Sequence, residues 1–249
     1  MAISLTQIEK ENIKALNINW NDSTSEIRKN IENNIQSAKD NKIIFLTESF
    51  GDTSTNYIIP YIEKGKIDVV TGTNLEMIIT ILKEDGKLKF EKIPYRIKEK
   101  GIKSIKVINN TNEKELKTYT RIILMGIGSL PMKFYETLNI SIDEEFSQKP
   151  HILTIFPQKE IFEIEDKLKE LILPDTKERF LILVDKIFSN NLYFMLKKIV
   201  KDTNSTVISG INFPMVTYAV KNIDTMDKNF LEKILTRGKR NIKVISELL

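Results

Sequence analysis

Two acidic residues that directly follow apolar stretches are the first candidates for chemistry in this chain. Glu48 follows the stretch KIIFLT, and Asp185 follows the similar stretch RFLILV. After Glu48 comes SFGDTSTN, which adds a glycine and a run of hydroxyl groups that can surround an anion. The same residue types also form ordinary turns, in which a strand-end acid caps free backbone amides. The pattern therefore indicates an anion-binding or catalytic turn, with a purely structural turn as the alternative.

The histidine and cysteine counts limit this chemistry. The chain has one histidine, His151, and no cysteine. Disulfides, thiol catalysis, thiolate metal sites and metal sites with several imidazoles are therefore excluded. Histidine-based proton or phosphoryl transfer has a single candidate. We expect neither a metal nor another cofactor.

The composition is typical of a globular protein. The 249 residues, 41% hydrophobic and 29% charged, suffice for one large domain or two of ordinary size. The net charge is +4 and the basic residues are spread along the chain, so we expect no nucleic-acid partner. No apolar run approaches the ~20 residues of a membrane span, and the first residues do not read as a signal peptide. Together with the lack of cysteine, this predicts a cytoplasmic protein without direct membrane insertion.

Two parts of the chain share a sequence pattern. IDVVTGTNLEM (residues 67–77) and STVISGINFPM (residues 205–215) both read as a β-branched strand followed by [ST]-G-x-N-[LF]-x-M. Matched residues keep nearly one spacing: 138 positions for Asn74 and Asn212, 137 for Glu48 and Asp185, 138 for Ile13 and His151, and 141 for Glu91 and Glu232. A constant spacing over four landmarks indicates a tandem duplication.

Each copy is expected to run strand, helix, strand, helix, strand, helix, helix. In the first copy, residues 13–18 alternate as a strand, and DSTSE (residues 22–26) caps a helix with Ile27, Ile31 and Ile35 on one face. Residues 42–47 and 67–71 are continuous apolar runs, typical of parallel strands buried on both faces. The alternation predicts an α/β fold with open, mainly parallel sheets and flanking helices. Ligands bind such sheets beyond the carboxyl ends of the strands, where Glu48, Gly72 and Asn74 are expected.

The second copy has an additional strand and helix at its front. Residues 121–125 read as a strand, GIGSLP as a turn, and residues 132–138 as the start of a helix. The first copy, residues 1–108, lacks this strand and most of this helix. The second copy spans residues 119–249, and NNTNEKELKT (residues 109–118) is the expected linker. Either the chain is a fragment that starts inside a domain, or the first copy completes its sheet in another way.

FLTESFGDTSTN followed by TGTNLEM resembles the IIA domain of the mannose-type sugar phosphotransferase system. That family typically reads L-x-D-L-F-G-G-[ST]-P-x-N and then [ST]-G-x-N-L-P-M. Glu48 stands at the acid, Phe50, Gly51, Thr53 and Asn56 match, Asp52 replaces the second glycine, and Ser54 replaces the proline. The second copy keeps the acid as Asp185 and nearly all of SGINFPM, but its loop reads KIFSNNLYF. The resemblance covers almost the whole chain.

The resemblance implies a phosphoryl relay. A IIA domain accepts phosphate from the carrier HPr on a histidine at the end of its first strand, and passes it to a IIB partner. A carboxylate, here Glu48 or Asp185, orients that imidazole, and nearby turns hold the phosphoryl oxygens. By this resemblance the phosphate-binding turns comprise Gly51, Thr53, Ser54, Asn56, Gly72, Asn74, Gly210 and Asn212. The last four also have structural explanations, because glycine permits a tight turn and asparagine caps a helix.

The family's histidine is missing. Its first strand ends S-H-G, whereas the second copy has Gly126, Ile127 and Gly128 there, and the first copy lacks the segment. His151 opens the second strand of the second copy, where we expect no catalytic role. The chain as given is therefore predicted not to be phosphorylated by HPr. A histidine upstream of Met1 would make the first copy active, with Glu48 as its orienting acid.

The sequence therefore predicts a degenerate IIA-like component, with an HPr-like carrier and a IIB-type protein as partners if it is active. The alternative is a non-catalytic regulatory or scaffolding module with an unknown protein partner. IIA domains of this family resemble homodimers that exchange a C-terminal strand. By this resemblance we expect an intramolecular pseudo-dimer, in which residues 102–108 or residues 241–248 join the sheet of the other copy.

Overall fold

The computed structural model describes residues 13–18, 21–39, 41–84, 86, 88–109, 119–141, 149–156, 161–172, 179–203, 205–225 and 227–249. The chain divides into two compact units. Unit 1 comprises Met1–Ile102 and Arg240–Leu249, and unit 2 comprises Lys103–Lys239. Unit 1 therefore includes the C-terminal ten residues, which follow unit 2 in the sequence.

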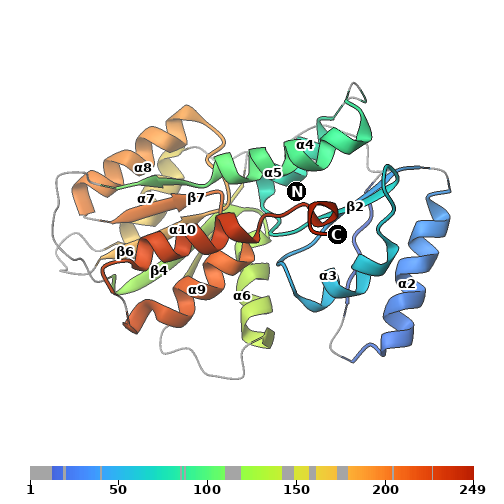
Figure 1. Ribbon diagram of the computed structural model, residues 1–249. Helices are drawn as coiled ribbons and strands as arrows, with labels where there is room; N and C mark the ends of the chain where they lie inside the picture. Colours follow the sequence, from blue (N-terminus) through green and yellow to red (C-terminus); the bar gives the residue numbers. More distant parts are fainter. Residues whose placement is uncertain are drawn as a thin grey trace. The chain divides into compact units, whose positions relative to one another are not determined.

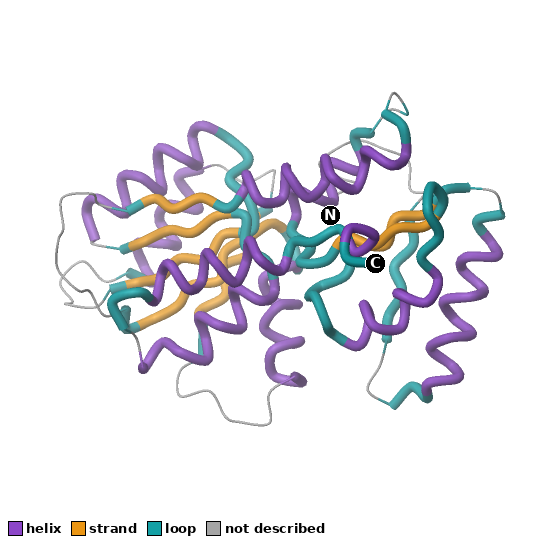
Figure 2. Tube along the Cα trace, viewed as in Figure 1, coloured by secondary structure: helices purple, strands orange, loops and turns teal. Residues whose placement is uncertain are grey.

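Unit 2 is built on a five-stranded sheet with the strand order β3-β7-β6-β4-β5. Four strands pair in parallel: β4 (Arg121–Ile127), β5 (His151–Ile155), β6 (Phe180–Val184) and β7 (Thr206–Ser209). Strand β3 (Lys106–Ile108) pairs antiparallel with β7 at the edge (Figure 2). Every residue of β6 and β7 is buried, as expected for strands covered on both faces.

Helices cover both faces of this sheet (Figure 1). Helices α7 (Ile161–Leu171) and α8 (Asn190–Thr203) share one apolar core with strands β4 to β7. On the other side lie α6 (Leu130–Ser141), α9 (Phe213–Asn222), the short 3-10 helix η4 (Ile223–Thr225) and α10 (Phe230–Asn241). The predicted α/β fold with a mainly parallel sheet and flanking helices is confirmed for this unit.

Unit 1 contains a parallel strand pair, β1 (Ile43–Leu46) and β2 (Ile67–Val70). Its helices are α2 (Thr24–Ser37), α3 (Thr53–Ile58), α4 (Leu75–Leu82) and α5 (Ile93–Ser104), with the 3-10 helices η2 (Ile59–Tyr61), η3 (Phe90–Lys92) and η5 (Ile245–Glu247). Helix α2 begins with a capping box of Ser23 and Glu26 and buries Ile27 and Ile31, as predicted.

Residues 13–18 do not form the predicted strand. They have no regular structure, and Ile13 is 39% exposed. In unit 2, the corresponding strand β5 pairs only with β4. Among the described residues of unit 1 no strand takes the place of β4, so an alternating segment here has no backbone to pair with. Ile18 instead packs against the small core cluster around Ile27 and Ile31.

The two segments predicted to exchange differ in form. Strand β3 follows helix α5 and joins β7 of unit 2, where Val107 lies opposite Ile208. The C-terminal segment packs in unit 1, but only Val244 pairs with Val70, and Ile245–Glu247 forms η5 instead of a strand. The first segment therefore forms a strand of the sheet of unit 2, whereas the second makes a single bridge.

The structure also revises one spacing. Helices α5 and α10 begin 137 positions apart, at Ile93 and Phe230, so Glu91 and Glu232, which are 141 apart, are not structural equivalents. Glu91 lies before α5, in η3, whereas Glu232 lies in the first turn of α10, which accounts for the difference. The expected linker, apart from Asn109, lies outside the described residues.

No helix in the described part of the chain has the length and apolar character needed to cross a membrane.

Candidate functional site

The predicted acids and glycines lie at the carboxyl edge of the strands in each unit. In unit 1, Glu48 follows β1 and Gly72 follows β2, and these strands are parallel. In unit 2, Asp185 follows β6 and Gly210 follows β7, again in a parallel pair. The prediction that they share one edge within each unit is confirmed.

The two asparagines of the repeated motif are structural. The Oδ1 atom of Asn74 accepts the Met77 amide hydrogen (N–O 3.1 Å) and caps α4, while its Nδ2 donates to the carbonyl of Gly101 at 3.1 Å. Asn212 is also buried and makes the equivalent bonds, to the Met215 amide at 3.4 Å and the Gly238 carbonyl at 3.1 Å. Each asparagine therefore ties a strand-to-helix turn to a later helix of its unit.

Sequence reasoning missed the glycines to which these asparagines bind. A Cβ atom at Gly101 would lie 2.6 Å from Met77 Cγ, and one at Gly238 would lie 2.3 Å from Met215 Sδ. The methionine of the motif thus packs where the helix has no side chain. A glycine inside a helix of both predicted copies, 137 positions apart, was the signal that could have found them.

Gly72 and Gly210 let another segment pass close to their turns. Their φ angles are 68° and 72°, a region that favours glycine. A Cβ atom at Gly72 would lie 2.7 Å from the backbone of Asn241, and one at Gly210 would lie 2.4 Å from the carbonyl oxygen of Ser104. Both glycines are therefore explained by backbone packing.

Asp185 is bound by backbone amides. The side chain is buried, its Oδ2 accepts from the Ile127 amide at 2.8 Å, and its Oδ1 accepts from the Lys186 amide at 2.6 Å. Burial raises the pKa of Asp185 to about 6, although the two amide hydrogen bonds oppose this shift. This carboxylate therefore fixes the backbone at the end of β4, where the resemblance places a histidine.

No side chain fits at Gly126. A Cβ atom there would lie 2.6 Å from both Cγ and Oδ2 of Asp185, and 2.9 Å from Pro131 Cγ. The neighbouring Ile127 is apolar and 1% exposed, and Gly128 has no side chain. These three residues therefore present no nucleophilic group at the carboxyl edge of unit 2.

In unit 1, the turn after Glu48 is organised by its own acid, Asp52. One carboxylate oxygen accepts from the Thr55 amide (2.7 Å) and the Ser54 hydroxyl (2.9 Å), and the other accepts from the Ser49 amide (3.0 Å). Asp52 is also the N-cap of α3. Three donors of the predicted phosphate-binding turn are thus already paired with a negative charge.

The other residues of this turn are close together but serve the backbone. Gly51 has a φ of 82°, and the side-chain amide of Asn56 donates to its carbonyl at 3.2 Å. Thr53 is exposed at the first position of α3. Glu48 is exposed as a residue, yet partial burial of its carboxyl group, and secondly the charge of Asp52, raise its pKa above the usual range.

Comparison with known proteins identifies structural neighbours of low sequence identity. No protein-family model and no curated protein matches the chain. The chain is similar to the PTS IIA protein associated with the fucose utilization operon from Streptococcus pneumoniae, with 18% identity and a TM-score of 0.44 over 53% of this chain and 98% of that chain. Phosphotransferase system component EIIA from Streptococcus agalactiae has 19% identity and a TM-score of 0.42, over 51% and 98%. The mannose/sorbose specific IIA subunit from Enterococcus faecalis has 15% identity and a TM-score of 0.42, over 51% and 94%. Likeness at this level assigns no role to any residue of this chain.

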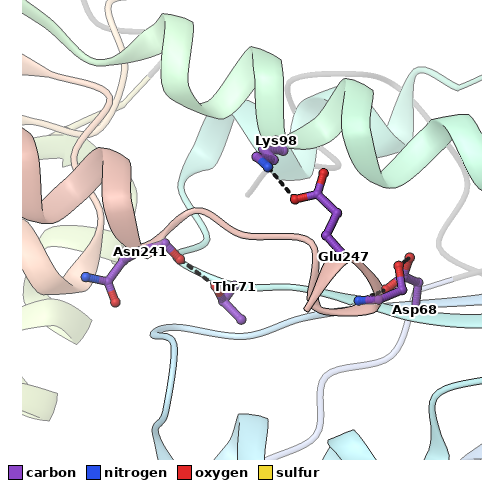
Figure 3. Close-up of polar contacts among 6 residues, drawn as sticks. Asp68, Thr71, Lys98, Asn241 and Glu247 are labelled. Carbon is purple, nitrogen blue, oxygen red and sulfur yellow. Dashed lines mark hydrogen bonds and ion pairs between the residues drawn. The ribbon is translucent and has the colours of Figure 1, made fainter. Parts of the chain in front are cut away.

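Asn241 is a further residue at the edge of unit 1 that sequence reasoning missed. Its Oδ1 accepts from the Ser49 hydroxyl at 3.0 Å and from the Phe50 amide at 3.3 Å. Its carbonyl accepts from the Thr71 hydroxyl (Figure 3). Asn241 is 192 positions from Ser49, so no local pattern signals the contact.

Within unit 2, His151 lies at the opposite end of the parallel strands from Asp185. It starts β5, at the opposite end of the strand from Ile155, and its Nε2 is 3.3 Å from Arg121 Nη1. Four residues of strand separate it from the carboxyl edge by about 13 Å.

In the part of the chain that the structure describes, no group of three His, Cys, Asp or Glu side chains could hold a metal ion.

Proposed function

We propose that this chain is a degenerate IIA-like component of the mannose-type phosphotransferase system that does not accept phosphate at either described carboxyl edge. The observation that supports this most directly is the contact between Asp185 and Gly126. The acid that would orient a histidine instead accepts two backbone amides, and it fills the space that a side chain at residue 126 would need. A cytoplasmic location is part of the proposal.

A phosphoryl acceptor needs a nucleophilic side chain beside donors for the phosphoryl oxygens. At the edge of unit 2, Ile127 is buried and its two neighbours are glycines. At the edge of unit 1, the donors of Ser49, Ser54 and Thr55 are bound by Asp52, whose negative charge repels phosphate. Both arrangements support the proposal that neither edge accepts phosphate.

Phosphotransfer from phosphoenolpyruvate tests the proposal. The full chain is incubated with enzyme I, HPr and labelled phosphoenolpyruvate, beside a IIA protein that has its histidine as the positive control. We expect no acid-labile label on this chain, and no difference between the parent chain and its His151→Ala variant. Label that disappears in His151→Ala would overturn the assignment of that histidine, and any other acid-labile label would overturn the proposal.

The second candidate function is a regulatory or scaffolding module that binds a protein partner. It is favoured by large aromatic side chains at the surface of unit 2, since Phe162 of α7 is 60% exposed and Phe194 of α8 is 64% exposed. Exposed aromatic groups frequently mark contact surfaces. Binding of unphosphorylated HPr and of a IIB-type protein, compared between the parent chain and Phe194→Ala, tests this candidate. Loss of binding in the variant supports it, and equal binding argues against this surface.

We further propose that the two parts of the chain are tandem copies that form an intramolecular pseudo-dimer. In support, the hydrogen bond between Thr73 and the Thr47 carbonyl in unit 1 corresponds to that between Ile211 and the Val184 carbonyl in unit 2. The asparagine bonds to Gly101 and Gly238 correspond in the same way. Such pairs at one spacing are expected if both parts descend from one unit.

A further inference from the structure

The same tetrapeptide, IKVI, occurs in both segments that follow a last helix. It occupies residues 105–108 and residues 242–245. In unit 2 its valine, Val107, lies opposite Ile208, and in unit 1 the corresponding Val244 lies opposite Val70, antiparallel in both cases. The shared valine therefore pairs at the same position of each unit, so the tetrapeptide sequence alone does not specify which unit it joins.

The backbone contacts just before the tetrapeptide do not discriminate either. The Thr71 hydroxyl donates to the carbonyl of Asn241 in unit 1. The Ser209 hydroxyl donates to the carbonyl of Ser104 in unit 2, at 3.4 Å. Each carbonyl also lies beside a motif glycine, Gly72 or Gly210. Discrimination by sequence would therefore come from side chains outside the tetrapeptide.

Three side chains of the C-terminal segment make polar contacts in unit 1, and Figure 3 shows the pair of Lys98 and Glu247 among them. Asn241 Oδ1 accepts from Ser49 and Phe50, as described above. The Ser246 hydroxyl donates to Oδ2 of the buried Asp68 at 2.6 Å, and its amide lies 3.3 Å from Oδ1 of the same residue. Glu247 pairs with Lys98 at 2.6 Å, and both side chains are largely covered, with about 30% exposed.

The equivalent positions of unit 2 offer different chemistry. Asp68, two residues before Val70, corresponds to Thr206, whose hydroxyl is buried and already accepts from the Tyr119 hydroxyl at 2.7 Å. Lys98, three residues before Gly101, corresponds to Leu235, three residues before Gly238. Ser246 would lose its carboxylate acceptor there, and Glu247 would meet an apolar side chain at the position of Lys98.

We infer that Asn241, Ser246 and Glu247 direct the C-terminal IKVI segment to unit 1, although the tetrapeptide itself fits both units. These three residues form the address of the segment, and Ser49, Asp68 and Lys98 recognise it. The ligand that this surface of unit 1 selects is a peptide with an amide acceptor before the hydrophobic run and a hydroxyl and a carboxylate after it. The inference does not depend on the proposed function.

Introduced cysteines can measure where the segment docks, because the natural chain has none. The test chain carries Val70→Cys, Ile208→Cys and Val244→Cys. Residues directly opposite in antiparallel strands have Cα atoms about 4.5–5.5 Å apart, within the range of a disulfide. After oxidation, peptide mapping of chains that migrate as monomers gives the share of residue 244 linked to residue 70 and to residue 208. We expect the link to residue 70 to dominate.

The address is then removed by Asn241→Ser, which copies Ser104, together with Ser246→Ala and Glu247→Ala. We expect the ratio of links to residue 208 over links to residue 70 to rise at least about tenfold, since each lost polar contact contributes up to roughly tenfold. The control is Glu63→Ala in the same cysteine background, which removes an exposed ion pair with Lys66 in unit 1 and leaves the ratio unchanged.

A ratio that stays within about twofold of the parent value after removal of the address would overturn the inference, and chain connectivity would then set the docking site. If the triple variant does not fold, as judged by circular dichroism, the three single substitutions are measured in the same background. At least one of them must raise the ratio, and an unchanged ratio in all three would equally overturn the inference.

Discussion

At Asp185, a buried carboxylate binds two backbone amides, and this contact makes the stability of unit 2 depend on pH. Burial raises its pKa to about 6, above the usual range of an aspartate near ~4. Between these two values the folded state binds a proton more tightly than the unfolded state. The contribution of Asp185 to stability is therefore greatest below about pH 4 and is lost as the pH rises through about 6, by at most about 3 kcal/mol.

The substitution Asp185→Asn tests this dependence. The neutral amide cannot titrate, so we expect the fall in unfolding free energy between about pH 4 and about pH 6 to become shallower than in the parent chain. Urea unfolding at several pH values, monitored by circular dichroism, measures the free energy of unfolding and its dependence on pH. Asp202→Asn changes an exposed carboxyl group of unit 2 and serves as the control. Equal slopes in the parent chain and Asp185→Asn would contradict the prediction.

Gly126 and Asp185 are coupled by their shape. A methyl group at residue 126 would overlap the carboxyl group of Asp185, so we expect Gly126→Ala to destabilise unit 2 by about 1–3 kcal/mol. In the double variant Gly126→Ala with Asp185→Gly, the overlap with the carboxyl group is gone. The double variant should therefore be more stable than the sum of the two single effects, as a double-mutant cycle would measure. Additive effects would show that the overlap is relieved in another way.

At the level of elements, each motif methionine packs against a glycine in the last helix of its unit. Met77 and Met215 are fully buried, so they have little room to move when a methyl group is added at Gly101 or Gly238. We expect Gly101→Ala and Gly238→Ala each to cost about 1–2 kcal/mol, because overpacking outweighs the gain in helix propensity. Thermal unfolding measures the cost, and Lys100→Ala at an exposed position of α5 is the matched control. An increase in stability for both glycine variants would contradict this explanation.

The elements also show how far sequence patterns reach. The continuous apolar runs located β1, β2 and β6. Every residue of β2 and β6 is buried, as the absence of polar alternation predicts, whereas the residues of β1 are only half-buried. The cap of α4 by Asn74 was equally predictable, since it depends on neighbouring residues. The alternation of residues 13–18 was misleading, because a strand also needs a neighbouring strand to pair with. Asn241 at the Ser49 turn was out of reach, since nothing local connects positions 192 apart.

At the level of the whole chain, each compact unit contains a segment that follows the last helix of the other predicted copy. Residues 103–108 pack in unit 2, and residues 240–249 pack in unit 1. In unit 1, the C-terminal segment contributes Ile242, Val244 and Ile245, which are at most 2% exposed. Burial of a large aliphatic side chain contributes about 1.5–3 kcal/mol, so this segment accounts for a large part of the ~5–15 kcal/mol that stabilises a domain.

Deletion of residues 241–249 is therefore expected to remove the protection of unit 1 against hydrogen exchange at Val69 and Val70. In the proposed pseudo-dimer, unit 2 should be destabilised as well, because β3 continues directly from helix α5, most of which belongs to unit 1. Faster exchange is thus expected also at Val207 and Ile208, which pair with β3. Removal of only residues 248 and 249, which are 54% and 79% exposed, should leave both pairs of amides unchanged. If the longer deletion left unit 1 protected, the C-terminal segment would not complete its core. If it affected unit 1 alone, the two units would fold independently, and the pseudo-dimer would have to be abandoned.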